Sequence, residues 1–293
     1  MKLLIFHITY FHSSFSNPPR YPFSQKNLPD GVAAFLRHVK TGGNVLNHPN
    51  NGGYLQWMLY PEYKIFMDME VPFLFTDSDF HTSVNLFSNE SVFKKVVETY
   101  HPDFISVPTW HNDFKDTIKN ISDYTIVFFD NNEVLYVDKR KHPNVSENYG
   151  IKDIDPYTII GANVEDLLKE KGEKKLIEPL LRMHKIYPDN GVVNQLMAII
   201  YNKTGSPQDA LSYAERVISS FPEASAGYRL KADALKALKK SIEAVIFYKN
   251  AIERASTQEA EKIHKDLGLA YIDMQDYKKA YKSFKKSINP YST

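Results

Sequence analysis

The second half of the chain repeats its pattern of small, apolar and polar positions, in steps of 34 and then 36 residues. The recurring positions are Ala198, Ala232 and Gly268; Tyr201, Leu235 and Tyr271; and Ala210, Ala244 and Ala280. Pro188 and Pro222 are also 34 residues apart, and each follows an aromatic residue. Small residues at fixed places let paired helices approach closely, and a proline ends a helix. The pattern therefore predicts stacked helix pairs.

This spacing resembles the tetratricopeptide repeat, most clearly in the runs Leu267–Tyr271 and Ala280–Phe284. The resemblance covers about residues 174–290 and implies three helix pairs after a leading helix at Lys174–Tyr187. We place the two extra residues of the third interval in a longer loop near Ala255–Gln258. Such repeats stack because one pair cannot bury its apolar face alone. The resemblance implies that this region binds a protein or peptide and does not catalyse a reaction.

The resemblance also maps a groove onto the first helix of each pair. The groove positions are Gln195, Ile199 and Asn202; Arg229, Asp233 and Lys236; and Lys262, Lys265 and Leu269. This stripe is polar with a basic lean, which suits a carboxylate or an acidic segment. The alternative is an ordinary solvated helix face, because lysine is common on exposed helices. We interpret the lysine pairs Lys239–Lys240, Lys278–Lys279 and Lys285–Lys286 as solvated charges.

Strands and helices alternate in the first half. The expected helices are 30–39, 54–60, 91–100 and 114–121, and the expected strands are 44–47, 64–70, 104–107, 124–129 and 133–137. Asp130-Asn131-Asn132 between the last two strands is a strong hairpin signal. The order predicts a three-layer α/β sandwich with a mostly parallel sheet that ends in a hairpin.

The run Gly52-Gly-Tyr-Leu-Gln-Trp57, followed by Tyr60-Pro61 and Asp68, carries a second resemblance. It is similar to the soluble α/β domain that follows the membrane helices of bacterial multi-spanning proteins of the dolichyl-phosphate-mannose glycosyltransferase type. Many of those proteins carry tetratricopeptide repeats at their C-terminus. The resemblance covers residues 28–140 and implies an extracytoplasmic, membrane-associated accessory domain. Many members continue the aspartate with Gly-Arg, whereas here Asp68 is followed by Met69-Glu70.

Composition supports a division near residue 150, because residues 1–150 hold 15 of the 18 Phe and only two Ala, whereas residues 151–293 hold 15 Ala. We therefore expect an α/β domain at 28–140, a linker at 141–157 and a helical repeat domain at 158–293. The apolar and Pro-rich residues 1–27 are interpreted as an N-terminal arm or as the end of a lost transmembrane helix. Met1–Phe11 is too short to cross a membrane.

The net charge and the absence of certain residues and motifs exclude several classes of function. The net charge of +1 gives no general reason to bind nucleic acid, and the absence of cysteine excludes disulfides and thiolate chemistry. No nucleotide-binding glycine loop or hydrolase elbow is present. We assign no catalytic, cofactor or metal residues.

Several residues of the first half have a structural interpretation beside a functional one. Asp68 and Glu70, with Asp77 and Asp79 nearby, are read as a solvated edge more readily than as a metal or sugar site. The histidines His48, His81, His101 and His111 are scattered over different element ends. Trp57 and Trp110 are expected in the core, with sugar stacking as the alternative. Gly52-Gly53 is expected to serve a tight turn and close helix packing.

Two hypotheses follow. The first is a non-catalytic accessory region of a membrane glycosyltransferase-like protein, with the repeats binding a protein partner or presenting substrate. The second is a free-standing adaptor, cytoplasmic in location, whose repeat groove binds peptides. A sugar- or nucleotide-handling enzyme is a third and weaker interpretation.

Overall fold

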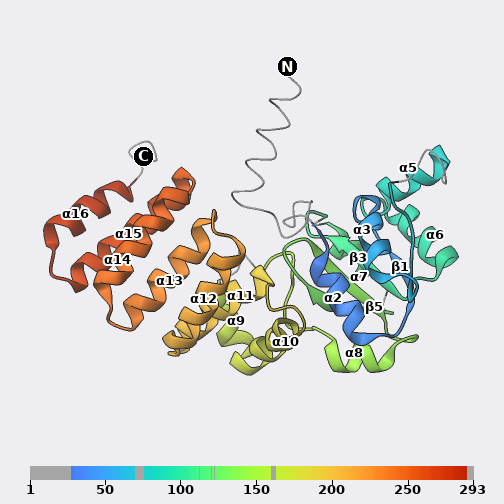
Figure 1. Ribbon diagram of the computed structural model, residues 1–293, viewed down its shortest axis with the longest axis horizontal. Coiled ribbons are helices and arrows are strands. Elements are labelled where there is room, and N and C mark those ends of the chain that lie inside the picture. The colour runs from blue at the N-terminus through green and yellow to red at the C-terminus, as the bar shows by residue number, and fades with distance from the viewer. Residues whose placement is uncertain are drawn as a thin grey trace, which may run out of the picture. The chain divides into compact units, whose positions relative to one another are not determined.

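The computed structural model describes residues 28–69, 76–111, 113–119, 121, 123–159 and 163–288 (Figure 1). The chain divides into two compact units. The first consists of Met1–Thr125 with Asn132–Ser146, and the second of Ile126–Asn131 with Glu147–Thr293. The expected N-terminal arm at 1–27 lies outside the described residues.

The first half of the chain forms an α/β region with a five-stranded sheet in the order β2-β1-β3-β5-β4. Its elements are α2 (Asp30–Val39), β1 (Gly43–Leu46), α3 (Pro49–Leu59), β2 (Tyr63–Ile65), α5 (Asp77–Asn85), α6 (Glu90–Tyr100), β3 (Phe104–Pro108), α7 (Phe114–Lys119), β4 (Tyr124–Phe129), β5 (Glu133–Asp138) and α8 (Pro143–Tyr149).

Strand β1 runs parallel to both of its neighbours. Its residue Val45 pairs with Ile65 of β2 and with Phe104 of β3. Phe104 pairs in turn with Val137 of the antiparallel strand β5. Every residue of β3 and β5 is buried, so both faces of the sheet are covered at these strands. This confirms the predicted α/β class, with parallel strands followed by a hairpin.

The strand expected at 64–70 is shorter than predicted, because β2 ends at Ile65. Beyond it, the backbone N–H of Phe66 still donates to the carbonyl of Val45, and the side chain of Asn47 binds the same segment. Its Oδ1 accepts a hydrogen bond from the backbone N–H of Phe66 at 3.0 Å, and its Nδ2 donates to the carbonyl of Met67 at 2.8 Å. A buried side-chain amide therefore binds the segment after β2, where the apolar pattern predicted that the strand would continue.

The expected linker at 141–157 contains helix α8 and two buried isoleucines, Ile151 and Ile154. It is therefore partly folded. The expected domain boundaries themselves stay a prediction.

The second half consists of helices in antiparallel succession, coloured from yellow-green to red in Figure 1. They are α9 (Val164–Lys171), α10 (Glu173–Ile186), α11 (Gly191–Lys203), α12 (Pro207–Ser220), α13 (Ser225–Ala237), α14 (Ser241–Arg254), α15 (Thr257–Asp273) and α16 (Tyr277–Lys286). The pairs α11/α12, α13/α14 and α15/α16 are the three predicted pairs, and α10 is the predicted leading helix. The stacked-helix class is confirmed.

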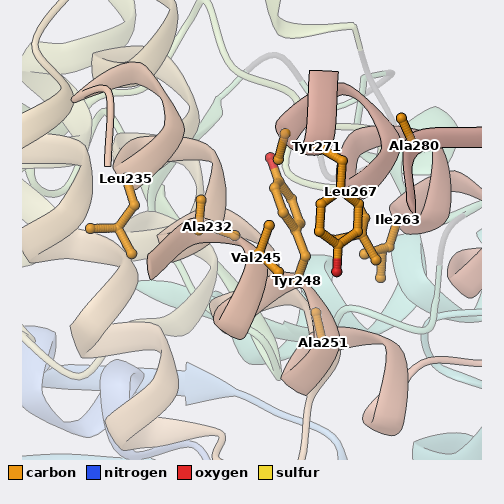
Figure 2. Packing of buried hydrophobic residues seen from close by; sticks show 11 residues of the cluster. Ala232, Leu235, Val245, Tyr248, Ala251, Ile263, Leu267, Tyr271 and Ala280 are labelled. Carbon is orange, nitrogen blue, oxygen red and sulfur yellow. The ribbon is translucent and has the colours of Figure 1, made fainter. Parts of the chain in front are cut away.

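Small residues allow the close helix contacts, as the repeat pattern predicted. Ala232, Ala244 and Ala280 are almost fully buried in one cluster around Tyr248 and Tyr271. Figure 2 shows these two tyrosines at the centre of the cluster, with their hydroxyl groups at opposite ends. A Cβ atom added at Gly268 would lie 2.6 Å from the ring of Phe284.

The expected longer loop near Ala255–Gln258 is wrong. Helix α14 ends at Arg254 and α15 begins at Thr257. Helix α15 has 17 residues, against 13 for both α11 and α13, so the inserted residues extend the helix instead of the loop. A capping box starts it, because the Ser256 hydroxyl accepts from the N–H of Glu259 while the Glu259 carboxylate accepts from the N–H of Ser256.

Among the described residues, no helix is both long enough and apolar enough to cross a membrane.

Candidate functional site

The predicted groove positions all lie on the first helices of the three pairs. The structure places Gln195 and Asn202 on α11; Arg229, Asp233 and Lys236 on α13; and Lys262 and Lys265 on α15. All seven are half-buried or exposed, whereas Leu196, Ala232 and Leu267 on the same helices are buried. Each first helix therefore presents its groove positions on a face outside the apolar core, which we call the stripe.

Two stripe residues already have partners within the protein. The Nε and Nη2 atoms of Arg229 donate to Oδ2 of Asp266 at 3.1 and 2.8 Å, which joins α13 to α15. The Tyr248 hydroxyl donates to Oδ1 of Asp233 at 2.5 Å. Burial, with a smaller contribution from the nearby Asp266 carboxylate, raises the pKa of Asp233 to about 6, although the Tyr248 hydrogen bond acts in the opposite direction. The Arg229–Asp266 contact thus joins neighbouring repeats, and the Tyr248–Asp233 contact joins the two helices of one repeat.

The remaining cations of the stripe are the exposed Lys262 and Lys265 and the half-buried Lys236. None of the three forms an ion pair with a described residue. At the start of the stripe, Oδ1 of Asn202 is buried without a hydrogen-bond partner among the described residues. The unpaired cations of the stripe are therefore these three lysines. Its role as a binding surface stays a prediction.

A cavity of about 390 Å³ lies between α14, α15 and α16. Its buried or half-buried lining includes the apolar residues Ile252, Leu267 and Tyr271. Its exposed lining consists of Lys249, Glu253, Lys279, Lys282 and Lys286. Lys279 and Lys286 belong to the lysine pairs interpreted above as solvated charges, and their place in the cavity lining differs from that interpretation. The spacing 279, 282 and 286, which places three lysines on one face of a helix, is a signal that could have indicated this face.

The acidic residues of the first unit that were interpreted as a solvated edge lie in different elements. Asp68 lies beyond the end of β2, and Glu70 lies outside the described residues. Asp79 belongs instead to the capping box of α5, where its carboxylate accepts from the hydroxyl of Thr76 at 2.7 Å and from its backbone N–H at 3.0 Å. These bonds lower the pKa of Asp79. Asp77 and Asp79 are thus first-turn residues of a helix.

The structure brings together His48 and His111, which are far apart in the sequence. The rings of His48 and His111 lie 5.9 Å apart between centroids, and Trp110 lies 3.8 Å from His111. Both histidines follow the carboxyl ends of parallel strands, β1 and β3, which meet at one edge of the sheet. Burial lowers the pKa of both, and that of His111 falls to about 4 with His48 nearby. His81 and His101 lie elsewhere, in α5 and at the end of α6.

The expected core position of the tryptophans is wrong, because Trp57 is 65% exposed and Trp110 is 62% exposed. Each ring instead lies against a polar or amphipathic ring at the surface. Trp57 is 6.0 Å from Tyr54, and Trp110 contacts both His48 and His111. An aromatic residue with a polar group is stable at such a partly wet position.

Only one glycine of the Gly52-Gly53 pair has the expected packing role. A Cβ atom at Gly52 would lie 1.9 Å from the carbonyl oxygen of Met67, whereas one at Gly53 would meet nothing within 4 Å. Neither residue forms the turn before the helix, because α3 begins earlier, at Pro49, with His48 as its N-cap.

Buried Glu133 connects three elements of the first unit. Its Oε1 accepts a hydrogen bond from Asn51 of α3, and its Oε2 accepts from the Ser106 hydroxyl of β3 at 2.8 Å. The arrangement satisfies a buried carboxylate and fixes α3 against the sheet. Within the described residues, no group of three or more histidine and acidic side chains is arranged to hold a metal ion.

Comparison with known proteins concerns the repeats. Residues 266–289 match the family described as tetratricopeptide repeat, so the chain contains such a repeat within a tetratricopeptide-like helical region. None of the curated proteins matches the sequence.

Solved structures share a low level of similarity with the chain. MamA from Desulfovibrio magneticus RS-1 is 18% identical with a TM-score of 0.39, over 50% of this chain and 80% of that one. BtubC from P. vanneervenii is 12% identical with a TM-score of 0.40, over 71% of this chain and 84% of that one. IFIT1 with Gppp-AAAA is 15% identical with a TM-score of 0.40, over 96% of this chain and 54% of that one.

Proposed function

We propose that the protein acts by binding and not by catalysis, and that its repeat unit docks a segment of a partner protein along the stripe. Tetratricopeptide repeats mediate protein interactions in general, and residues 266–289 match that family. The observation that carries the proposal is the placement of the groove positions. They all fall on α11, α13 and α15, outside the apolar core, on the first helix of each successive pair.

The chemistry of the stripe favours an acidic partner segment. Arg229 is neutralised by Asp266, but Lys262 and Lys265 are exposed and form no ion pair with a described residue. Lys236 adds a third cation from the neighbouring repeat. Carboxylates of a partner would gain charge-assisted hydrogen bonds there, and the gain would fall with ionic strength.

The test is binding of labelled peptides of acidic, neutral and basic composition, measured by fluorescence anisotropy. We expect the acidic peptides to bind most tightly. The double variant Lys262→Glu with Lys265→Glu should weaken that binding by about tenfold or more, because it places like charges opposite the ligand. A ranking in which neutral or basic peptides bind as well as acidic ones would contradict the proposal.

The leading helix α10 offers a matched control, because Lys175 and Lys185 are exposed there and lie outside the stripe. The variant Lys175→Glu with Lys185→Glu makes the same change in net charge. We expect it to keep the affinity within about twofold, since charges farther than a Debye length away are largely screened. An equal loss of affinity in both variants would show that net charge causes the effect, and would contradict binding along the stripe.

A narrower proposal concerns the setting of the protein. The resemblance of residues 28–140 supports an accessory region of a membrane glycosyltransferase-like protein on the extracytoplasmic side; the alternative is a free-standing cytoplasmic adaptor. Translation of the DNA upstream of Met1 separates the two. Hydrophobic segments in that DNA would support the membrane setting, and a promoter with a ribosome site directly before Met1 would support the adaptor. Fractionation adds to this, because a native protein found only in the cytosol would exclude the membrane setting.

A further inference from the structure

Helix α16 is the most basic element of the repeat unit. Five of its ten residues are lysines, and none is acidic. Three of them, Lys279, Lys282 and Lys286, line the cavity between α14, α15 and α16, and Lys249 of α14 lines it as well. Lys279 is paired with Asp276 at 2.7 Å. The other three form no ion pair with a described residue, so the cavity is lined by three unpaired positive charges.

The interior of the same cavity is apolar. Leu267 and Tyr271 of α15 are buried, and Ile252 of α14 is half-buried. His264 adds a polar atom, because its Nδ1 is buried and has no hydrogen-bond partner among the described residues. The acidic residue of the lining, Glu253, lies 3.8 Å from the cation of Arg254. The cavity thus combines an apolar interior with unpaired cations around it.

We infer that this cavity is a second docking site, which takes an acidic segment of a partner protein. One apolar side chain of that segment inserts over Leu267 and Tyr271, and flanking carboxylates lie against Lys249, Lys282 and Lys286. The inference rests on the proposed function, that the repeat unit docks protein segments, and adds a separate surface to it. A volume of about 390 Å³ is at the small end of known ligand pockets, which suits one anchoring side chain with its neighbours.

The cavity and the stripe lie on opposite faces of α15. His264, Leu267 and Tyr271 follow one helical row, and the stripe residues Lys262 and Lys265 follow another that is displaced by two residues. Two residues turn an α-helix by about 200°, which places the rows nearly opposite each other. Variants on one surface therefore leave the other intact.

The hollow shape of the cavity favours a protein segment as its occupant over an anionic membrane. The lysines on the exposed rim could meet lipid headgroups, but the flat surface of a bilayer does not fill a cavity whose apolar atoms lie beneath that rim. An extended chain with a single bulky side chain does fill it, and the binding energy then concentrates on that anchor. A membrane is therefore the competing occupant that the experiment has to exclude.

The probes are two labelled peptides that carry the same Asp and Glu residues around one central position. That position is Leu in the first peptide and Ala in the second. We expect the Leu peptide to bind the full-length protein at least about tenfold more tightly, because the Leu side chain is buried on binding. Equal affinities would show attraction by charge alone and would overturn the inference.

Charge reversal tests the lysines. Lys249 and Lys282 are exposed, so Lys249→Glu with Lys282→Glu is expected to fold normally and to weaken binding of the Leu peptide by about tenfold or more. Lys278 and Lys285 are exposed on the same helix α16 but do not line the cavity. The control Lys278→Glu with Lys285→Glu makes the same change in net charge and should weaken binding less than the cavity variant does, because these two side chains do not line the cavity.

The outcomes separate this inference from the proposed function. In one outcome, Lys262→Glu with Lys265→Glu abolishes peptide binding while Lys249→Glu with Lys282→Glu does not. That result would support the stripe as the binding surface and overturn the cavity site. If only the cavity variant abolishes binding, the cavity is the docking site and the stripe is not. If neither peptide binds, both proposals fall. Sedimentation with anionic phosphatidylserine vesicles that depends on Lys249 and Lys282, without peptide binding, would overturn the inference in favour of a lipid surface.

Discussion

The longest polar contacts within the α/β region span more of the chain than those between the stacked helices α9–α16. In the α/β unit, Glu133 binds Asn51, 82 residues away, and Nε2 of His142 lies 2.9 Å from Asp103, 39 residues away. In the repeats, Lys231 pairs with Glu215 at 2.8 Å over 16 residues. The longer contact between Arg229 and Asp266 still joins adjoining repeats. A repeat array is stabilised between neighbours, whereas the sheet region depends on distant pairings.

This contrast predicts how damage spreads in each unit. A change at a distant pairing in the α/β unit should loosen several elements at once, whereas a change in the repeats should act on one or two helix pairs. Both tryptophans, Trp57 and Trp110, lie in the first unit. Tryptophan fluorescence therefore reports on that unit alone, and far-ultraviolet circular dichroism reports mainly on the helices.

The largest effect is expected from Gly52→Ala. The new methyl group would overlap the Met67 carbonyl, so α3 has to move away from the segment after β2. We expect a loss of about 2 kcal/mol in the free energy of unfolding followed by tryptophan fluorescence in urea. Gly53→Ala is the matched control, because nothing lies within 4 Å and alanine favours a helix by about 0.5–1 kcal/mol over glycine. Equal effects of the two substitutions would contradict the close approach at Gly52.

An intermediate, pH-dependent effect is expected from Asp233→Asn in the repeats. Burial raises the pKa of Asp233 from 3.8 to about 6, so the folded state holds a proton that the unfolded state releases. The stabilisation from this proton is greatest below the unfolded-state pKa of 3.8. It is lost as the pH rises through the folded-state pKa of about 6. Between about pH 5 and about pH 7.5 the loss is about 1 kcal/mol.

Asp233→Asn should remove this part of the pH dependence, because an amide does not titrate and can still accept from Tyr248. Unfolding curves followed by circular dichroism at both pH values measure it. The control is Asp273→Asn, an exposed position on α15. An unchanged pH dependence in Asp233→Asn would show that the folded-state pKa of Asp233 is not raised.

The smallest effect is expected from the partly exposed pair Arg229 and Asp266. Its side chains are 41% and 24% exposed, and such pairs contribute little. A double-mutant cycle with Arg229→Ala and Asp266→Ala should give a coupling of about 0.5 kcal/mol that decreases in high salt. The fluorescence transition of the first unit should not move. A coupling well above 1 kcal/mol, or a shift of the fluorescence transition, would contradict the local character of the repeats.

Most of the repeat region could be predicted because its signals are local. The steps that relate Ala198, Ala232 and Gly268 mark the same place in three helix pairs, and the leading helix at 174–187 corresponds to α10. The error at the third interval also has a local cause. Ser256 and Glu259 have the spacing of a capping box, which indicates a helix start at this position and not a loop.

The α/β unit was predictable in class and less so in detail. Its strands are apolar runs, and the sequence indicated where most of them begin and end. It did not indicate that Asn47 binds the segment beyond Ile65, because the hydrogen bonds to Phe66 and Met67 join segments about 20 residues apart. The meeting of His48 with His111 likewise requires two strands to lie side by side.

The sequence by itself determined the succession of helix pairs and the α/β class, because helical and strand periodicities follow from local backbone geometry and can be read over a few residues. Tertiary structure alone decided which charges are neutralised, which tryptophans are exposed and where a cavity opens. Arg229 pairs with Asp266, and Lys249 lines the same cavity as Lys282, only after helices of adjoining repeats have packed together. Electrostatic attraction and burial depend on distances in space, which a linear pattern does not contain.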